Sequence, residues 1–69
     1  MEAAEERVLL GLRTVEGVPL SVLDALPAAA RPLAEMVEEG FLTVVERRLI
    51  ATAAGRPLLD AVTSRLLRD

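Results

Sequence analysis

The 69-residue sequence predicts a single α+β domain. Three observations support this fold class. The chain is long enough for only one small hydrophobic core. Apolar residues recur at helical spacing over most of the chain, whereas between residues 41 and 51 they follow the two-residue period of strands. We therefore expect one domain over residues 1–69, in which helices and a hairpin share one core.

The composition limits the chemistry that this chain can perform. Hydrophobic residues make up 52% of it and Phe41 is its single aromatic residue, so the core must consist mainly of Leu, Val and Ala. The sequence contains no Cys and no His. Disulfides, thiolate or imidazole metal ligands and histidine general bases are therefore excluded. We expect no catalytic, cofactor-binding or metal-binding residue in this chain.

The charge pattern bears on partners and location. Eleven acidic residues against eight arginines give a net charge of −3, which does not draw the chain as a whole to nucleic-acid phosphates. No apolar run approaches the ~20 residues that span a bilayer. The acidic start "MEAAEERV" also differs from a signal peptide. We expect no nucleic-acid partner, no membrane span and a cytoplasmic location.

Two helices are predicted in the first part of the chain. Residues 2–15 form the first, and the sequence "EGVP" ends it, because Gly17 permits a left-handed turn and Pro19 disfavours helix at the residue before it. Residues 19–26 form a short second helix, followed by the connector "LPAAARP". The expected apolar positions of the two helices are Val8, Leu9, Leu12, Val15, Leu20, Leu23 and Leu26.

A third helix and a hairpin follow. The helix covers residues 30–39 with Pro32 in its opening turn, and it ends at Gly40 in the left-handed conformation. Its apolar stripe is Leu33, Met36 and Val37. The segments "FLTVVE" and "LIAT" then pair as two strands. We expect a short, irregular turn at residues 46–48, because the sequence lacks Asn-Gly.

The second strand leads into the last helix through "TAAGRP". The Thr52 hydroxyl is expected to accept a hydrogen bond from an amide two or three residues on, and Gly55 lets the backbone approach a neighbouring segment. Pro57 would disrupt a helix that began several residues before it. We therefore expect a single tight turn first and regular helix from about residue 57. The buried stripe of this helix is predicted to be Leu58, Leu59, Val62 and Leu66.

The predicted elements are three helices, a hairpin and a last helix, in that order. This is the order of a winged-helix-like domain, a fold that occurs in DNA-binding proteins, protein-interaction modules and accessory domains of enzymes. The third helix would have to read DNA, yet it carries Glu35, Glu38 and Glu39 against Arg31 alone. The arginines at 47 and 48 are expected to form a solvated turn. A DNA-binding transcriptional regulator and a free-standing protein–protein interaction module therefore remain the alternatives to an enzyme appendage.

Stand-alone catalysis is not supported by the side chains. Glu35 and Glu39 lie four residues apart on one helix face, but a solvated acidic face explains them without a metal ion. Ser21 and Ser64 have no His or Lys that could activate them. We expect that this chain alone is not an enzyme.

Three segments carry a family resemblance. The first, "LGLRTVEG", matches at residues 10–13 and at Glu16 and Gly17; the second is "GFL" at residues 40–42. The third, "TAAGRPLLD", matches at Thr52, Gly55, Arg56 and residues 58–60. From about residue 7 to 67 the chain resembles the C-terminal domain of the oxygen-independent coproporphyrinogen III oxidase family, which includes related haem chaperones. It departs from the family pattern at two positions, Ala51 and Pro57, where the family usually has leucine.

The resemblance implies a C-terminal fragment of a larger radical S-adenosylmethionine (SAM) protein. The parent would be an oxidoreductase or haem chaperone whose CxxxCxxC motif holds a 4Fe-4S cluster beside SAM, so the cofactors would lie outside this chain. This domain would pack on the catalytic barrel of the same polypeptide, and porphyrin or haem would bind to the parent. Arg13 and Arg56 are the implied contacts to the barrel or to a propionate. Alternatively, each arginine caps carbonyls or pairs with a carboxylate. A further expectation is one face with more exposed Leu and Val than a small core needs.

Overall fold

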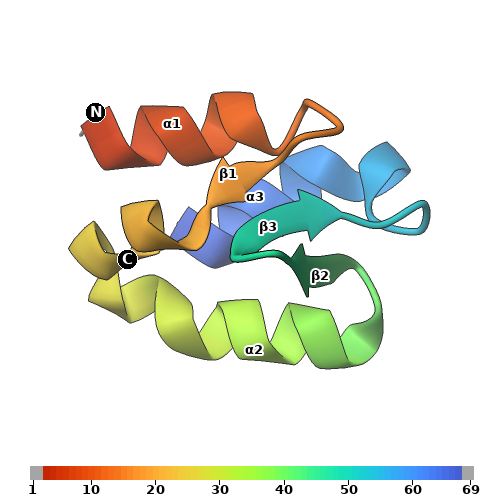
Figure 1. The fold of residues 1–69 in the computed structure, drawn as a ribbon. Coiled ribbons are helices and arrows are strands. Elements are labelled where there is room, and N and C mark those ends of the chain that lie inside the picture. Colours follow the sequence, from red (N-terminus) through yellow and green to blue (C-terminus); the bar gives the residue numbers. More distant parts are fainter. Residues whose placement is uncertain (1–2, 68–69) are drawn as a thin grey trace.

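A computed structural model describes residues 3–67 and confirms the α+β class (Figure 1). Its helices are α1 (Ala3–Gly11), α2 (Ala30–Glu39) and α3 (Leu59–Leu67), and its strands are β1 (Val18–Pro19), β2 (Leu42–Val45) and β3 (Arg48–Ala51). Three 3-10 helices connect them: η1 (Leu20–Ala25), η2 (Pro27–Ala29) and η3 (Arg56–Leu58). The arrangement is compatible with a winged helix, and that finer assignment stays a prediction.

The sheet is antiparallel with the order β1-β3-β2. Leu42 pairs with Ala51 and Val44 with Leu49, and these side chains point toward the core side of the sheet. In Figure 1, α1 lies above the sheet, α2 below it and α3 behind it. No helix of residues 3–67 lies over the face turned toward the viewer.

One hydrophobic core fills the space between the sheet and the helices. The pattern "VLLGL" places Val8 of α1 and Leu12, the residue after it, four residues apart on one side of the chain, and both side chains are fully buried. The single cluster of buried residues comprises Val8, Leu12, Val18, Val22, Ala29, Met36, Leu42, Leu49, Ala51, Val62 and Leu66. Leucine, valine, alanine and one methionine make up this core, as the composition predicts.

The first helix is shorter than predicted. It ends at Gly11 instead of continuing to residue 15, and residue 2 lies outside the described part of the chain. Thr14 explains the end, because its hydroxyl donates to the carbonyl oxygen of Gly11 at 2.8 Å and accepts from the amide of Gly17 at 3.1 Å. These bonds favour a turn over further helix. Val15, predicted to be on the buried side, is 77% exposed.

The predicted second helix is present, but as the short 3-10 helix η1 instead of an α-helix. Residues 18–19 form β1, which pairs with β3, and the following residues form η1 and η2. Pro19 is extended, with ψ at 136°, and Pro27 keeps Leu26 out of the helical region. The six residues of η1 lie between these two constraints and are too few for a stable α-helix. Val22 is the buried residue of this segment, while the three predicted leucines are half-buried.

The third helix agrees with its predicted bounds. Gly40 has φ of +89°, and the amides of Gly40 and Phe41 donate to the carbonyls of Val37 and Met36. This is the Schellman arrangement that the glycine indicates. Val37 was predicted to be on the buried stripe, but it is exposed, because the stripe centres on Met36.

The hairpin turn differs from the irregular turn expected. Only Glu46 and Arg47 separate the two paired residues Val45 and Arg48, and both have positive φ, at 51° and 64°. Positive φ at both central residues is the signature of a type I′ turn, whose twist matches the twist of the strands. The strands therefore impose this turn on two residues that do not favour it.

Candidate docking surface

The structure brings together the first and the third of the segments that carry the family resemblance. Arg56, at the start of η3, donates from Nη2 to the carbonyl oxygen of Thr14 at 3.4 Å. Arg13 Nη2 lies 3.9 Å from Oδ1 of Asp60 in α3. Segments about forty residues apart in the sequence therefore meet at one end of the molecule. From the sequence, the alternative to a contact with the barrel or a propionate is a carbonyl or a carboxylate partner. In the structure Arg56 contacts a carbonyl and Arg13 lies near a carboxylate.

The strand-to-helix joint is held by Thr52 and Gly55. The Thr52 hydroxyl donates to the carbonyl oxygen of Gly40 at 2.5 Å and accepts from the amide of Gly55 at 3.1 Å, which confirms the predicted bond three residues on. A Cβ on Gly55 would lie closer than 3.0 Å to the carbonyl oxygen of Phe41. The glycine is thus needed for close backbone approach, and the joint is fastened to the end of α2.

The two departures from the family pattern are accommodated locally. Ala51 is buried and pairs with Leu42 across the hairpin. Pro57 lies in the first residues of η3, where a missing amide costs no helical hydrogen bond. Regular helix begins at Leu59, two residues later than expected, and Leu58 is 46% exposed instead of buried.

The acidic face of α2 is used for contact with α3. Arg65 donates to both carboxylate oxygens of Glu39, at 2.8 and 3.3 Å, and lies 3.6 Å from a carboxylate oxygen of Glu35. The hydrogen bond from Arg65 lowers the pKa of Glu39 and raises the pKa of Arg65 itself. Within residues 3–67 no group of three acidic side chains is placed to hold a metal ion.

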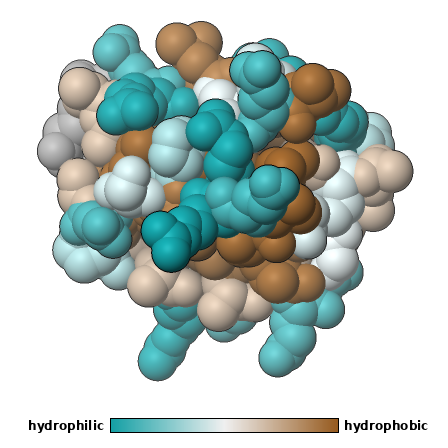
Figure 2. All heavy atoms as spheres, viewed as in Figure 1, coloured by the Kyte–Doolittle hydropathy of each residue, from teal (hydrophilic) through white to brown (hydrophobic). Residues whose placement is uncertain are grey.

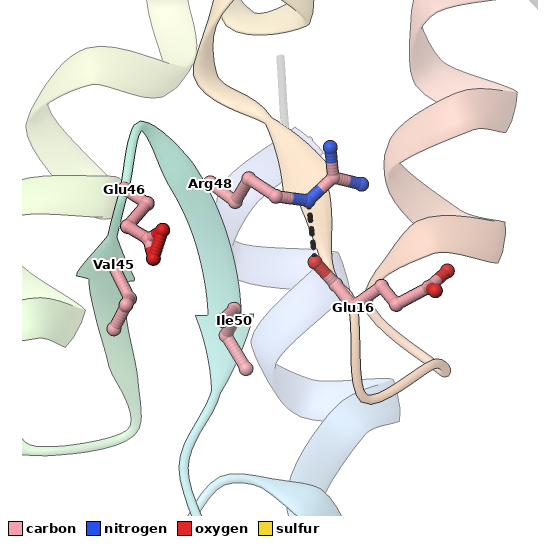
Figure 3. A pocket seen from close by; sticks show the side chains of 5 residues that line it. All are labelled: Glu16, Val45, Glu46, Arg48 and Ile50. Atoms are coloured by element: carbon pink, nitrogen blue, oxygen red, sulfur yellow. Dashed lines mark hydrogen bonds between the residues drawn. The ribbon is translucent and has the colours of Figure 1, made fainter.

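The outer sheet face is the face without a covering helix, and we define it by Thr43, Val45, Arg48 and Ile50. Thr43 pairs with Ile50 and Val45 with Arg48, so all four side chains point away from the core. An open pocket of about 480 Å³ lies over part of this face, and its lining consists of Val45, Arg48 and Ile50 together with Glu16 and Glu46 (Figure 3). Figure 2 shows hydrophilic groups across the middle of the same view, with hydrophobic surface beside and below them.

Arg48 has a role that the sequence did not reveal. Its Nε donates to the carbonyl oxygen of Glu16 at 2.7 Å and its Nη2 to that of Gly17 at 3.2 Å (Figure 3). Instead of a solvated turn residue, Arg48 is a strand residue that holds the loop before β1. The alternation of side chains along the strand "RLIA" could have indicated this role, because it places Arg48 and Ile50 on the same face of the sheet.

Exposed apolar side chains are present, though on several elements instead of one face. The large ones are Leu10, Val15, Val37, Val44, Val45 and Leu58. They lie on α1, its following loop, α2, β2 and η3. The expectation of spare Leu and Val is therefore confirmed, whereas their concentration on one face is not. No helix among residues 3–67 has the length and hydropathy needed to cross a bilayer.

Comparison with known proteins identifies the class of this domain. The sequence pattern of the HemN C-terminal domain family matches residues 1–58, so the chain belongs to that family. It is also 35% identical, over 97% of its length, to "Radical S-adenosyl methionine domain-containing protein 1, mitochondrial" of Dictyostelium discoideum. The chain spans only 17% of that relative's length. No solved structure shows a significant match. The family assignment that the three sequence segments implied is confirmed, and the domain is an accessory domain of the radical SAM protein family.

Proposed function

We propose that this chain is the non-catalytic C-terminal domain of an oxygen-independent coproporphyrinogen III oxidase-like protein and packs on the catalytic barrel of the same polypeptide. The family match over residues 1–58 carries this proposal. The Dictyostelium relative supports it, because its name specifies a radical SAM domain and most of its length lies outside the matched region.

In this proposal the redox chemistry belongs to the rest of the polypeptide. A 4Fe-4S cluster needs cysteine ligands, and this chain has none. The cluster, SAM and any porphyrin or haem would therefore bind to the parent. The domain contributes a preformed surface that steadies the barrel and helps to close its substrate site. The parent acts in porphyrin biosynthesis or haem delivery.

Arg13 and Arg56 remain candidates for contact with the barrel or with a substrate propionate. The two lie at the same end of the domain, since Arg56 reaches the carbonyl of Thr14, the residue next to Arg13. The Arg13 side chain is 65% exposed and the Asp60 side chain is 100% exposed, so this ion pair is weak and can be exchanged for another anion. Arginine is suited to bind a carboxylate through two N–H groups.

Reading DNA with α2 is the less favoured role. Glu35, Glu38 and Glu39 are all exposed on α2, and the last two residues of this set lie at the end of the helix nearest the hairpin. Such a face repels phosphate groups. We propose that no nucleic acid binds, and a gel shift with duplex DNA at physiological salt should show no retention beyond that of an unrelated acidic protein.

The location of the protein is also a proposal. The cytoplasm is the proposed location. The Dictyostelium relative, by contrast, is named as a mitochondrial protein. Fluorescence microscopy of the tagged complete polypeptide distinguishes the two locations.

The reading frame that contains this chain gives the first test of the proposed function. Three cysteines in the order CxxxCxxC should be encoded upstream. A reading frame that begins at Met1 would contradict the proposal. In the complete polypeptide, removal of residues 1–69 should abolish turnover or haem transfer while the visible absorbance of the reconstituted cluster persists.

The arginines are tested in the complete polypeptide by the double variant Arg13→Gln, Arg56→Gln. Weaker binding of the porphyrin substrate is expected, seen as a raised KM with little change in cluster absorbance. Arg31→Gln is the matched control, because Arg31 is also exposed but lies on α2. Equal effects of the double variant and the control would rule out a specific role for the two arginines.

A further inference from the structure

We propose that the outer sheet face is the surface through which this domain contacts the catalytic domain of its polypeptide. The inference rests on the proposed function and adds to it the site of contact. It is carried by the arrangement of Val45 and Ile50 inside a rim of charged groups, over a sheet that no helix covers (Figures 1 and 3).

The apolar centre of this face consists of two β-branched side chains on adjacent strands. Val45 is 49% exposed, and Ile50 is half-buried beside it in the open pocket. Exposed apolar side chains also occur on α1, α2 and η3, but Val45 and Ile50 are the two apolar residues that line this pocket. The outer sheet face thus carries a small apolar centre that is open to solvent, and covering it is favourable because apolar surface is removed from water.

The rim of the face specifies the chemistry of the partner. Glu16 and Glu46 line the pocket, and neither carboxylate forms an ion pair within residues 3–67. The Arg48 guanidinium between them is engaged by the carbonyls of Glu16 and Gly17. The complementary surface should therefore offer an apolar centre with an arginine or lysine at its edge.

The face is preformed, which lowers the entropic cost of contact. Arg48 fixes the loop that carries Glu16, and the amide of Leu20 donates to the carbonyl of Arg47 at 2.9 Å, which fixes the hairpin turn. Gly17 lets this loop lie directly on β3, since a Cβ there would collide with the carbonyl of Leu49. Both walls of the pocket are thus tied to the sheet.

The catalytic domain is a better occupant than a second copy of this chain. A two-fold dimer would place the same patch against itself, so that the Glu16 and Glu46 carboxylates of the two copies would approach one another. The guanidinium of Arg48 is already bound to carbonyls and leaves these carboxylates uncompensated. A domain linked in the same polypeptide also needs less intrinsic affinity, because it is present at high effective concentration. In the Dictyostelium relative, the part of the polypeptide outside the matched region is long enough to contain such a domain.

Thiol labelling tests this assignment, because the chain has no native cysteine. Val45→Cys and Thr43→Cys introduce one thiol each on the outer sheet face. Ser64→Cys is the matched control on α3, which lies behind the sheet, and Ser64 is exposed. The rate of alkylation by iodoacetamide is measured for each variant by peptide mass spectrometry, in the 69-residue chain and in the complete polypeptide.

The expected result is that thiols at positions 43 and 45 react at least about tenfold more slowly in the complete polypeptide, while the thiol at position 64 reacts equally fast in both. Protection at 64 without protection at 43 and 45 would overturn the assignment of this face and leave the proposed packing intact. No protection at any position would contradict both proposals. Protection at 43 and 45 that grows with the concentration of the 69-residue chain alone would show a second copy as the occupant, and would also overturn the inference.

Discussion

Gly55 and Phe41 lie so close that no side chain fits between the α carbon of the glycine and the carbonyl oxygen of Phe41. This contact joins the loop after β3 to Phe41, which lies between α2 and β2. The amide of Thr52 donates to the same carbonyl at 3.0 Å, so the carbonyl is fixed from two sides. The short glycine-containing joint is therefore the place where the last helix is fastened to the rest of the domain.

Gly55→Ala should destabilise the domain by about 3 kcal/mol, because the added methyl group has to displace backbone. Thermal unfolding followed by circular dichroism should show a melting temperature lowered by more than about 10 °C. Gly40→Ala is the control: Gly40 has positive φ, but nothing lies within 4 Å of the added atom. It should cost only about 1 kcal/mol, from backbone strain alone. Equal losses would show that close approach is not what position 55 requires.

Thr52→Val should destabilise the domain by about 1 to 2 kcal/mol, because the carbonyl of Gly40 and the amide of Gly55 each lose a partner. Thr63→Val removes a hydroxyl that donates to the carbonyl of Leu59 within α3, and it should change stability by less than about 0.5 kcal/mol. Urea titration of both variants measures the difference. A Thr52 variant as stable as wild type would mean that the joint does not depend on this hydroxyl.

Replacing Glu46 and Arg47 by Asn and Gly should stabilise the isolated domain by about 1 kcal/mol, since those residues accept the positive φ that the turn requires. Replacing both by Ala removes the same charged side chains without relieving the backbone, and should give no gain. Denaturant midpoints provide the measurement. A larger gain for the alanine pair would attribute the effect to charge instead of conformation.

Stability should fall in acid partly through Glu39. Arg65 lowers the pKa of this carboxyl in the folded state, so its stabilising contribution is present above the ordinary pKa that the carboxyl has in the unfolded chain. That contribution is lost as the pH falls through the lower, folded value. In Glu39→Gln the decline in melting temperature between about pH 5 and pH 2 should be shallower than in wild type. Glu38→Gln serves as the control, and parallel curves for wild type and Glu39→Gln would contradict the pairing.

The sequence predicted best the features that depend on neighbouring residues. The bounds of α2 follow from Pro32 in its opening turn and Gly40 at its end, and both signals act within one turn of helix. The joint at Thr52 and Gly55 was also predictable, because a threonine hydroxyl reaches an amide three residues on. The family segments likewise led to the correct class of domain.

Features that depend on distant residues were not predictable. β1 exists because Val18 faces Leu49 across the sheet, a pairing that no local pattern indicates. Arg48 was assigned to a solvated turn because its carbonyl partners precede it by about thirty residues. The exposure of Val15 follows from the turn that Thr14 forms, which competes with the helical spacing. In each case tertiary contact overrode the periodic signal.

The most direct test of the central claim is amide hydrogen exchange of residues 3–67, measured in the isolated chain and in the complete polypeptide. If the domain packs on a catalytic neighbour, that contact adds to its free energy of unfolding. The amides of α1 and α3 that exchange through global unfolding should then exchange at least about tenfold more slowly in the complete polypeptide. Equal exchange rates in the two proteins would show that the domain gains no stability from contact with the rest of the polypeptide, and would contradict the claim.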